Sequence, residues 1–288
     1  TGAPVTMRYA FARREGVVLT PRSAELLLSG KGRIVVPVDF GRSSAEAVVA
    51  GDEVVLQLGF SAVVKRETLE RVVKLDKLLF VGPHSHYFVE VRSGRYYKLK
   101  YLGEGVAPTV EIDGIHMHNI TGTDPLSDAG RKVRLAGVRG GMRVLDVCTG
   151  LGYTAIAATR RGASVTSIEV DPNVLWLAEH NPYSEDLTRV EIILGDAFEV
   201  VEELDRDSFD AVIHDPPTLP LAGELYSLEF YRKLYRVARR GARVFHYTGA
   251  PGKHRGVNVQ KGVADRMRAA GFRVVRVIRG YGLVAVKD

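Results

Sequence analysis

The feature that most constrains the fold is a short apolar segment that runs through a glycine turn into a helical stretch. Arg143 to Val147 forms the apolar segment, Gly150-Leu151-Gly152 follows it, and the helical pattern continues to about Arg161. A strand, a glycine turn and a helix in this order form the first half of a parallel βαβ unit. Because glycine has no Cβ, its backbone can approach a ligand closely. The sequence therefore predicts an α/β domain with a ligand at this turn.

Acidic residues stand at the ends of three predicted strands. Asp146 precedes the glycine turn, Glu169 ends the strand 164–169, and Asp196 follows the strand 190–194. In a nucleotide-binding βαβ unit, an acid at the position of Glu169 binds the ribose hydroxyls. A carboxylate at Asp146 would repel a pyrophosphate, but it can accept hydrogen bonds from an ammonium group. This pattern favours S-adenosylmethionine over NAD, with Asp196 and Ala197 receiving the adenine amine.

From about Gly140 onward the chain resembles the class I, Rossmann-like methyltransferases. The resemblance rests on residues 146–155, on Asp215-Pro216-Pro217 and on residues 223–231, which are similar to a group of predicted archaeal methyltransferases. It implies a seven-stranded, mostly parallel sheet with an antiparallel last strand, and S-adenosylmethionine converted to S-adenosylhomocysteine without a metal. The cofactor-binding residues expected on this basis are Asp146, Thr149, Gly150, Gly152, Tyr153, Glu169, Val170, Asp196 and Ala197.

The later strands of such a sheet can be located in the sequence. Apolar runs predict them at residues 209–214, 242–247, 273–279 and 283–287. Tyr281-Gly282 supplies a tight turn between the last two.

The segment Asp215-Pro216-Pro217 indicates the chemistry. In related amino-methyltransferases, Asn or Asp followed by two prolines and an aromatic residue binds an exocyclic amine of a nucleobase. The Asp215 side chain and the Pro216 carbonyl would accept the two N–H bonds and stabilise the charge that develops on nitrogen. Proline fixes φ and lacks a donor, so Pro216 and Pro217 hold that carbonyl in one orientation. These three residues are the expected catalytic group.

The substrate-binding side of the site departs from that pattern. Thr218 stands where the aromatic residue is expected, so a stacking ring would have to come from Tyr226, Phe230 or Tyr231. Those rings lie on an amphipathic helix predicted over residues 224–240. Lys253 and Arg255, in a glycine-rich loop, are expected to contact a phosphate backbone.

The N-terminal residues show a different pattern of predicted secondary structure from the rest of the chain. We therefore predict two domains, 1–118 and 119–288. Short β-type runs at 17–19, 34–38, 54–58 and 87–91 alternate with helical pieces near 23–29 and 66–73. Ser93-Gly94 is expected to join the last run to a strand that alternates aromatic and cationic residues, a pattern suited to RNA contact. The expected fold class is thus α/β, with a smaller β-rich N-terminal domain that captures RNA or another substrate. A helix is expected over 126–135.

Composition limits the remaining possibilities. The net charge of +6 is compatible with a polyanionic partner, and no apolar run approaches the roughly 20 residues of a membrane span. We therefore expect a cytoplasmic protein without a membrane contact, and abundant arginine suits a thermophile. The pairs His84/His86 and His116/His118 lack a spacing that forces them together, so no metal is expected.

Three functions remain open from the sequence. The first is methylation of an exocyclic base amine in RNA, either ribosomal or transfer RNA, with cytosine N4 slightly favoured over adenine N6. The second is aminopropyl or methyl transfer to a polyamine or other small amine, because the stretch 223–231 is also similar to aminopropyltransferases such as spermidine synthase. The third is a non-catalytic RNA-binding protein that has kept the cofactor fold. The oligomeric state is not predicted.

Overall fold

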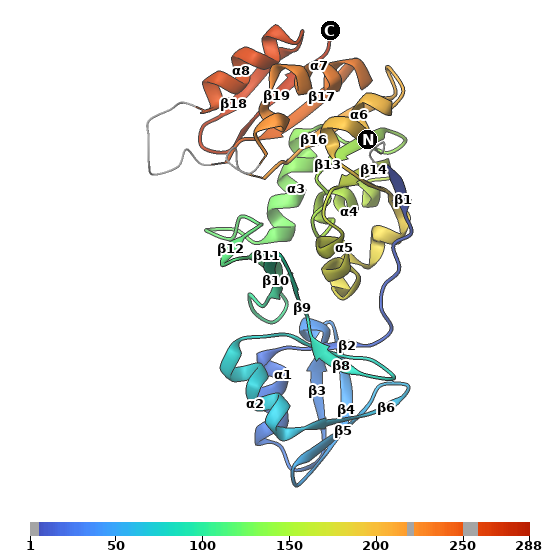
Figure 1. The fold of residues 1–288 in the computed structure, drawn as a ribbon, viewed down its shortest axis with the longest axis vertical. Coiled ribbons are helices and arrows are strands. Elements are labelled where there is room, and N and C mark those ends of the chain that lie inside the picture. The colour runs from blue at the N-terminus through green and yellow to red at the C-terminus, as the bar shows by residue number, and fades with distance from the viewer. Residues whose placement is uncertain (1–5, 218–221, 250–258) are drawn as a thin grey trace. The chain divides into compact units, whose positions relative to one another are not determined.

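The computed structural model describes residues 6–217, 222–249 and 259–288, which are drawn as ribbons in Figure 1. The chain forms two compact units. Within the described residues, the larger unit contains 6–11, 126–172 and 186–288, and the smaller one contains 12–125 and 173–185. No helix among them has the length and apolarity that crossing a bilayer requires.

The larger unit is built on one mostly parallel sheet with the strand order β1-β15-β14-β13-β16-β17-β19-β18. Strands β13 to β17 run parallel, whereas β19 is antiparallel to both of its neighbours. This arrangement confirms the predicted fold class. Its strands are β1 (Met7–Tyr9), β13 (Arg143–Val147), β14 (Ser164–Glu169), β15 (Glu191–Leu194), β16 (Phe209–His214), β17 (Ala238–Tyr247), β18 (Arg273–Ile278) and β19 (Gly282–Val286).

Two details of this sheet differ from the sequence-based expectation. Met7–Tyr9 adds an eighth strand, antiparallel to β15. A strand of only three residues leaves too short a pattern in the sequence to be predicted. The turn before the last strand is closed by the Tyr281 N–H, which donates to the Ile278 carbonyl at 3.0 Å, and Gly280 has φ +70°. The turn is therefore centred on Arg279-Gly280 rather than on Tyr281-Gly282.

The strand order reverses at β13, which has β14 on one side and β16 on the other. In such sheets, ligands bind outside the carboxyl ends of the strands at this point of reversal. The surrounding helices are α3 (Pro125–Leu135), α4 (Tyr153–Arg160), α6 (Ala197–Glu203), α7 (Leu228–Val237) and α8 (Val259–Ala269). Leu145, Val212 and Val244 are fully buried, as expected where helices cover both faces of a parallel sheet.

The amphipathic segment predicted as one helix over 224–240 is divided in the structure. A 3₁₀ turn, η3 (Gly223–Tyr226), precedes α7, and β17 already begins at Ala238. The Ser227 hydroxyl accepts a hydrogen bond from the Phe230 N–H at 3.1 Å and so caps α7. The capping residue starts a new helix, and pairing of Ala238 with Phe209 ends it.

The smaller unit contains three antiparallel sheets and two helices. One sheet has the order β3-β4-β5-β6, the second β2-β7-β8, and the third β12-β11-β10-β9. The helices are α1 (Pro21–Ser29) and α2 (Arg66–Leu75). The strands are β2 (Val17–Leu19), β3 (Gly32–Val38), β4 (Ser43–Ala50), β5 (Glu53–Gln57), β6 (Ser61–Lys65), β7 (Leu79–Val81), β8 (His86–Phe88), β9 (Glu90–Ser93), β10 (Arg95–Lys100), β11 (Thr109–Ile112) and β12 (Ile115–His116).

The predicted hairpin at Ser93-Gly94 is present, with Ser93 opposite Arg95. Its cations, however, already have acidic or carbonyl partners. Lys100 lies 3.3 Å from an Asp76 carboxylate oxygen and 3.7 Å from Glu111, and Lys98 donates to the Asp76 carbonyl. The charge of Lys100 is therefore partly neutralised within its own unit, and Lys98 is hydrogen-bonded there.

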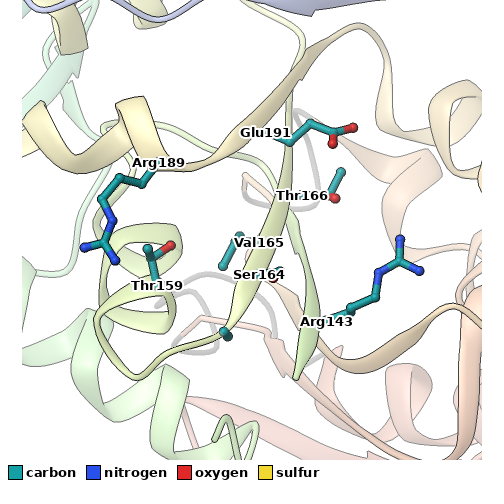
Figure 2. A pocket seen from close by; sticks show the side chains of 8 residues that line it. Arg143, Thr159, Ser164, Val165, Thr166, Arg189 and Glu191 are labelled. Atoms are coloured by element: carbon teal, nitrogen blue, oxygen red, sulfur yellow. The ribbon is translucent and has the colours of Figure 1, made fainter. Parts of the chain in front are cut away.

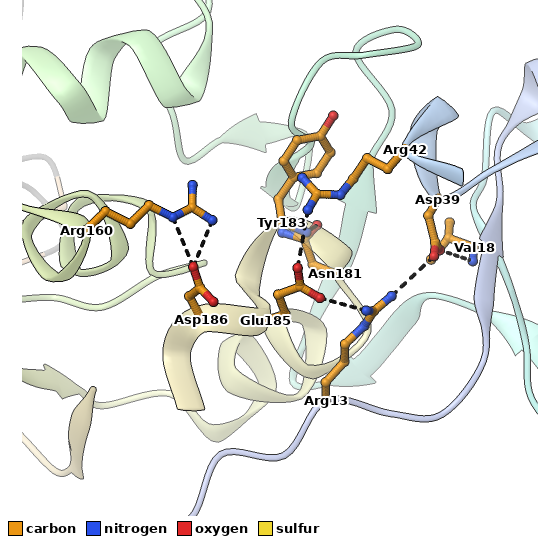
Figure 3. A network of polar contacts seen from close by, with 9 residues as sticks. All are labelled: Arg13, Val18, Asp39, Arg42, Arg160, Asn181, Tyr183, Glu185 and Asp186. Carbon is orange, nitrogen blue, oxygen red and sulfur yellow. Dashed lines mark hydrogen bonds and ion pairs between the residues drawn. The ribbon is translucent and has the colours of Figure 1, made fainter. Parts of the chain in front are cut away.

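Residues 173–185 belong to the smaller unit, although they follow β14 in the sequence. They include most of α5 (Pro172–Glu179) and the start of η2 (Pro182–Arg189). Figure 3 shows how Arg13 and Arg42 hold them: Arg13 lies 2.8 Å from Glu185 and 3.2 Å from Asp39, and Arg42 lies 3.3 Å from Glu185. These ion pairs link Glu185, at the end of the segment 173–185, to Arg13 and Arg42, which are far from it in the sequence but belong to the same unit.

Candidate active site

Four carboxylates gather at the carboxyl edge of the parallel strands. Asp146 and Glu169 lie at the ends of β13 and β14, Asp215 directly follows β16, and Asp196 lies two residues after β15. Because these parallel strands end at one edge, the three predicted cofactor acids and the predicted catalytic acid lie there together. Burial, and after it the charges of these four acids, raise the pKa of the Cys148 thiol. This is the edge at which the strand order reverses.

The glycine turn takes a backbone path that few residues tolerate. Gly150 has φ +56° and Gly152 φ +86°, and Cys148, which is not glycine, has φ +73°. A Cβ on Gly152 would lie 2.4 Å from a Leu187 methyl carbon, so both its conformation and its space require glycine. Thr149 and Tyr153, also predicted to bind cofactor, are buried beside the turn.

Asp146 lies beneath this turn and is fully buried. Its two oxygens accept hydrogen bonds from Thr154 Oγ1 at 2.8 Å and Ser167 Oγ at 2.6 Å. Burial raises the pKa of Asp146 to about 7. The sequence predicted that this carboxylate binds the ammonium of the cofactor. In the structure its two hydroxyl partners join β13 to α4 and β14.

Glu169 is positioned to accept further hydrogen bonds. Its Oε1 accepts from the Gly150 N–H at 2.8 Å and its Oε2 from the Asp171 N–H at 3.0 Å. Burial raises the pKa of Glu169, while the backbone donors of Asp171 and Gly150 oppose that rise. A carboxylate oxygen has more than one acceptor site, so each can still bind a hydroxyl. The acceptor oxygens of Glu169 therefore fit the two hydroxyls of a ribose.

The neighbouring strand ends present an apolar side chain and a second acid. Val170 directly follows Glu169 and is 64% exposed. Asp196 is exposed and caps α6, with one oxygen accepting from the Phe198 N–H at 2.8 Å, and Ala197 begins that helix. An exposed aliphatic surface between two acids is suited to a flat ring that carries an amine.

Asp215 has a buried cationic partner that the sequence reasoning missed. Lys132 Nζ lies 2.7 Å from Asp215 Oδ2 and 3.0 Å from Asp128 Oδ2, and Tyr281 Oη donates to the other Asp128 oxygen at 2.7 Å. The Lys132 ammonium also lies 4.3 Å from the centre of the Tyr247 ring. Burial opposes the charge of Lys132, but the two carboxylates outweigh it and raise its pKa. Asp215 is thus an ion-paired carboxylate.

The only sequence signal for this group was the spacing of Asp128 and Lys132, which are four residues apart on the predicted helix. That spacing places both on one helix face. It did not indicate that the face is buried, or that it meets residue 215.

The two prolines are anchored through the turn η3. Tyr226 Oη donates to the Pro217 carbonyl at 2.9 Å, and His214 Nε2 lies 2.7 Å from the Leu225 carbonyl. Pro216 is buried and Pro217 is exposed. The structure thereby fixes the Asp215-Pro216-Pro217 segment from both ends.

The aromatic residues assigned to substrate stacking are mostly core residues. Phe230 and Tyr231 are fully buried, and Tyr231 Oη is hydrogen-bonded to His246 Nε2 at 2.8 Å. Neither ring is open to a base, because both lie on the face of α7 that packs on the sheet. Tyr226 is also buried, but it contacts the proline segment as described. Thr218, Lys253 and Arg255 lie outside the described residues.

One of the two histidine pairs has local partners. His116 lies 3.2 Å from Glu111, and His118 Nδ1 lies 2.7 Å from Thr109 Oγ1. Within the described part of the chain, no group of three or more His, Cys, Asp or Glu side chains is arranged to hold a metal ion.

Comparison with known proteins covers both units of the chain. A family model described as a methyltransferase domain matches residues 139–250. An uncharacterized protein of Methanocaldococcus jannaschii, MJ1233, is 40% identical over 289 residues, which cover 98% of this chain and 96% of that protein. A candidate ribosomal RNA large subunit methyltransferase of the same organism, MJ1649, is 40% identical over 84 residues, covering 28% of this chain and 22% of that protein.

Among solved structures, spermidine synthase in complex with the transition-state analogue AdoDATO is similar in fold. The TM-score is 0.56 and the sequence identity 17%, with 72% of this chain and 78% of that chain covered. At this identity the likeness shows a shared fold alone.

Proposed function

Because the chain belongs to the class I family of S-adenosylmethionine-dependent methyltransferases, we propose that it methylates an exocyclic amine of a nucleobase in RNA. The observation that carries this proposal is the ion pair between Asp215 and the buried Lys132, next to two consecutive prolines at the end of β16. This arrangement offers hydrogen-bond acceptors to an amine, and the lysine offsets part of the negative charge of Asp215.

The cofactor would be held by the residues at the carboxyl edge. We assign the ribose hydroxyls to Glu169, the adenine ring to Val170, and the adenine amine to Asp196 with Ala197. The backbone of Thr149, Gly150 and Gly152 would lie against the methionine part. S-adenosylmethionine supplies a methyl group that is already activated on a sulfonium.

The protein's part in the reaction is to hold the acceptor amine. A base amine shares its lone pair with the ring and is a weak nucleophile until its geometry is fixed. Asp215, through the oxygen that Lys132 leaves open, and the Pro216 carbonyl would accept the two N–H bonds and aim the nitrogen. The N–C bond forms as the C–S bond breaks, its electrons remaining on sulfur. The nitrogen then loses one proton to water, which reaches Asp215 because that side chain is 24% exposed.

The buried cation weakens the attraction of this site for a polyamine. A polyamine is cationic near neutral pH, and an ammonium placed about 5 Å from the Lys132 ammonium is opposed by roughly 3 kcal/mol at an effective dielectric of about 20, which offsets part of its attraction to Asp215 and Asp128. Glu224 and Glu229, the acids that would add to the attraction of a polyamine, are both exposed to solvent. A base amine carries no charge and meets no such opposition.

RNA as the carrier of that base is supported by the match to MJ1649, within the 84 residues that align. The target base must be unpaired or rotated out of its stack to reach the proline segment. Cytosine N4 remains slightly favoured over adenine N6, in ribosomal or transfer RNA.

The rival proposal is transfer to a polyamine, for which the shared fold with spermidine synthase is the supporting observation. The test is to incubate the protein with methyl-labelled S-adenosylmethionine and, in parallel, archaeal RNA, putrescine or spermidine. Label in the RNA fraction alone supports the proposal. Label in a polyamine alone would replace it, and cofactor binding without transfer to any acceptor would favour a non-catalytic RNA-binding role.

A further inference from the structure

Arginines gather at the edge of the sheet opposite the candidate active site. Arg143 begins β13, Arg161 and Arg189 precede β14 and β15, Arg139 lies in the connection before β13, and Arg243 lies on β17. The amino ends of parallel strands share one edge, just as their carboxyl ends share the other. We call these five residues, all of them exposed, the arginine edge.

The arginine edge surrounds two hollows in the surface. One, of about 340 Å³, is lined by Arg143 and Arg189 together with the hydroxyl-bearing residues Thr159, Ser164 and Thr166. Figure 2 shows Arg143 and Arg189 reaching out from opposite sides of this hollow. The other, of about 400 Å³, is lined by Arg139, Arg161 and Arg243. Guanidinium and hydroxyl donors around a hollow are suited to phosphate oxygens.

The arginine edge has few acidic partners within the protein, although Arg143 helps to lower the pKa of Asp210. In residues 6–217, 222–249 and 259–288, none of the five forms an ion pair with a carboxylate. The acids that line the hollows are engaged by other arginines: Glu191 lies 3.7 Å from Arg8, and Asp210 lies 2.9 Å from Arg239. This differs from the hairpin β9–β10, in which Lys100 lies near the carboxylates of Asp76 and Glu111. Five exposed arginines without an ion pair in the described residues indicate an anionic partner.

We infer that the arginine edge binds the phosphate backbone of a folded RNA whose reacting base occupies the opposite edge of the sheet. The identity of the anion as RNA rests on the proposed function. Strand β13, which separates the two edges, has five residues and so is about 17 Å long. A free nucleoside cannot occupy both edges, whereas an RNA of many nucleotides can. The substrate is therefore an RNA chain rather than a small nucleotide, and a folded RNA can present a backbone and a base to the two edges at once.

The test compares two triple variants that remove the same charge. The first, Arg139→Gln/Arg161→Gln/Arg243→Gln, removes the cations around one hollow. The matched control, Arg268→Gln/Arg273→Gln/Arg276→Gln, removes three exposed arginines on α8 and β18. Binding of a fluorescein-labelled RNA hairpin is measured by anisotropy over a series of potassium chloride concentrations, and S-adenosylmethionine binding is measured by calorimetry to verify folding.

We expect the first variant to bind the hairpin on the order of tenfold more weakly and to lower the slope of log K against log salt by about 2, because phosphate contacts release counterions. The control keeps the wild-type slope, and both variants keep cofactor affinity. With labelled cofactor and RNA, the first variant raises KM and leaves kcat unchanged. Equal RNA binding by the two variants would overturn the assignment of the edge, even if RNA methylation itself stands. Absence of RNA methylation by the wild-type protein would instead overturn the proposed function.

Discussion

Lys132 Nζ lies 2.7 Å from Asp215 Oδ2 and thereby joins helix α3 to the end of strand β16. The two residues are 83 positions apart in the sequence, and the lysine side chain is only 8% exposed. This ion pair determines how much negative charge Asp215 presents to the substrate amine in the candidate active site.

Replacing the cation tests its importance for both stability and selectivity. Lys132→Met leaves Asp215 and the buried Asp128 without a counter-charge, and we expect the free energy of unfolding in urea to fall by about 3 kcal/mol. The variant should also bind spermidine more tightly than the wild-type protein in calorimetry, because the repelling ammonium is gone.

Lys287→Met is the matched control for that experiment. Lys287 is similarly buried, lies 2.8 Å from Asp207 and contacts the ring of Tyr235, but Asp207 is half-exposed to solvent. We expect a smaller loss of stability and no change in spermidine binding. A gain in spermidine affinity in both variants, or in neither, would contradict the selective role of Lys132.

The catalytic assignment is tested at Asp215. Asp215→Ala removes one of the two proposed acceptors for the amine, and we expect single-turnover methyl transfer to fall by on the order of 1,000-fold. Cofactor affinity should stay within about threefold, because the residue lies on the acceptor side. Asp215→Asn keeps one acceptor oxygen and should retain more activity than the alanine variant. Full activity of Asp215→Ala would show that the amine is held elsewhere.

Cofactor binding is tested at Glu169. Glu169→Gln retains the size of the side chain but replaces one acceptor oxygen with a donor, which faces either the Gly150 or the Asp171 N–H. We expect the Kd for S-adenosylhomocysteine, measured by calorimetry, to rise by roughly tenfold to a hundredfold, equivalent to the loss of a charge-assisted hydrogen bond. Glu191→Gln, at the opposite edge of the same sheet, should leave that Kd unchanged; an equal effect in both variants would argue against a ribose contact.

The buried Asp146 predicts a dependence of stability on pH. Burial raises its pKa to about 7 in the folded protein from the ordinary 3.8 of an aspartate, so the folded state holds a proton that the unfolded state releases between about pH 4 and 7. Its contribution to stability therefore falls as pH rises through this window, by up to about 1.4 kcal/mol per pH unit, and is constant above it.

Comparison with Asp146→Asn isolates this contribution. Burial lowers the pKa of His214 to about 4, and its contribution to stability rises with pH, but this is common to both proteins and cancels in their difference. We expect the stability of the wild-type protein relative to the variant to decline between pH 4 and 7 in urea unfolding. A difference that does not change over this range would show that Asp146 is ionised throughout.

Much of the larger unit could be predicted because its signals are local. The central strands are continuous apolar runs, which a parallel sheet covered on both faces requires, and the bounds 143–147, 164–169 and 209–214 agree with the structure. The glycine turn was equally visible. The acids could be placed at one edge because parallel strands end on the same side.

What the sequence did not show depends on contacts between distant segments. The pairing of Lys132 with Asp215, and of Ser167 with Asp146, follows from strand order and not from local pattern. The division at Ser227 was visible in principle, because serine is a favoured helix cap, but the apolar periodicity continues across it. Periodicity also does not distinguish a ring in the core from a ring in a binding site, which is why Phe230 and Tyr231 were assigned to the substrate.

The central claim is that a base amine of RNA, held by Asp215 and Pro216, receives the methyl group. The most direct measurement is to incubate structured archaeal RNA with the protein and methyl-labelled S-adenosylmethionine, digest the RNA to nucleosides, and identify the labelled nucleoside by mass spectrometry. We predict label on the exocyclic nitrogen of cytidine, or of adenosine, and its loss with Asp215→Ala. Label on a ring carbon, a ribose oxygen or a polyamine would contradict the account.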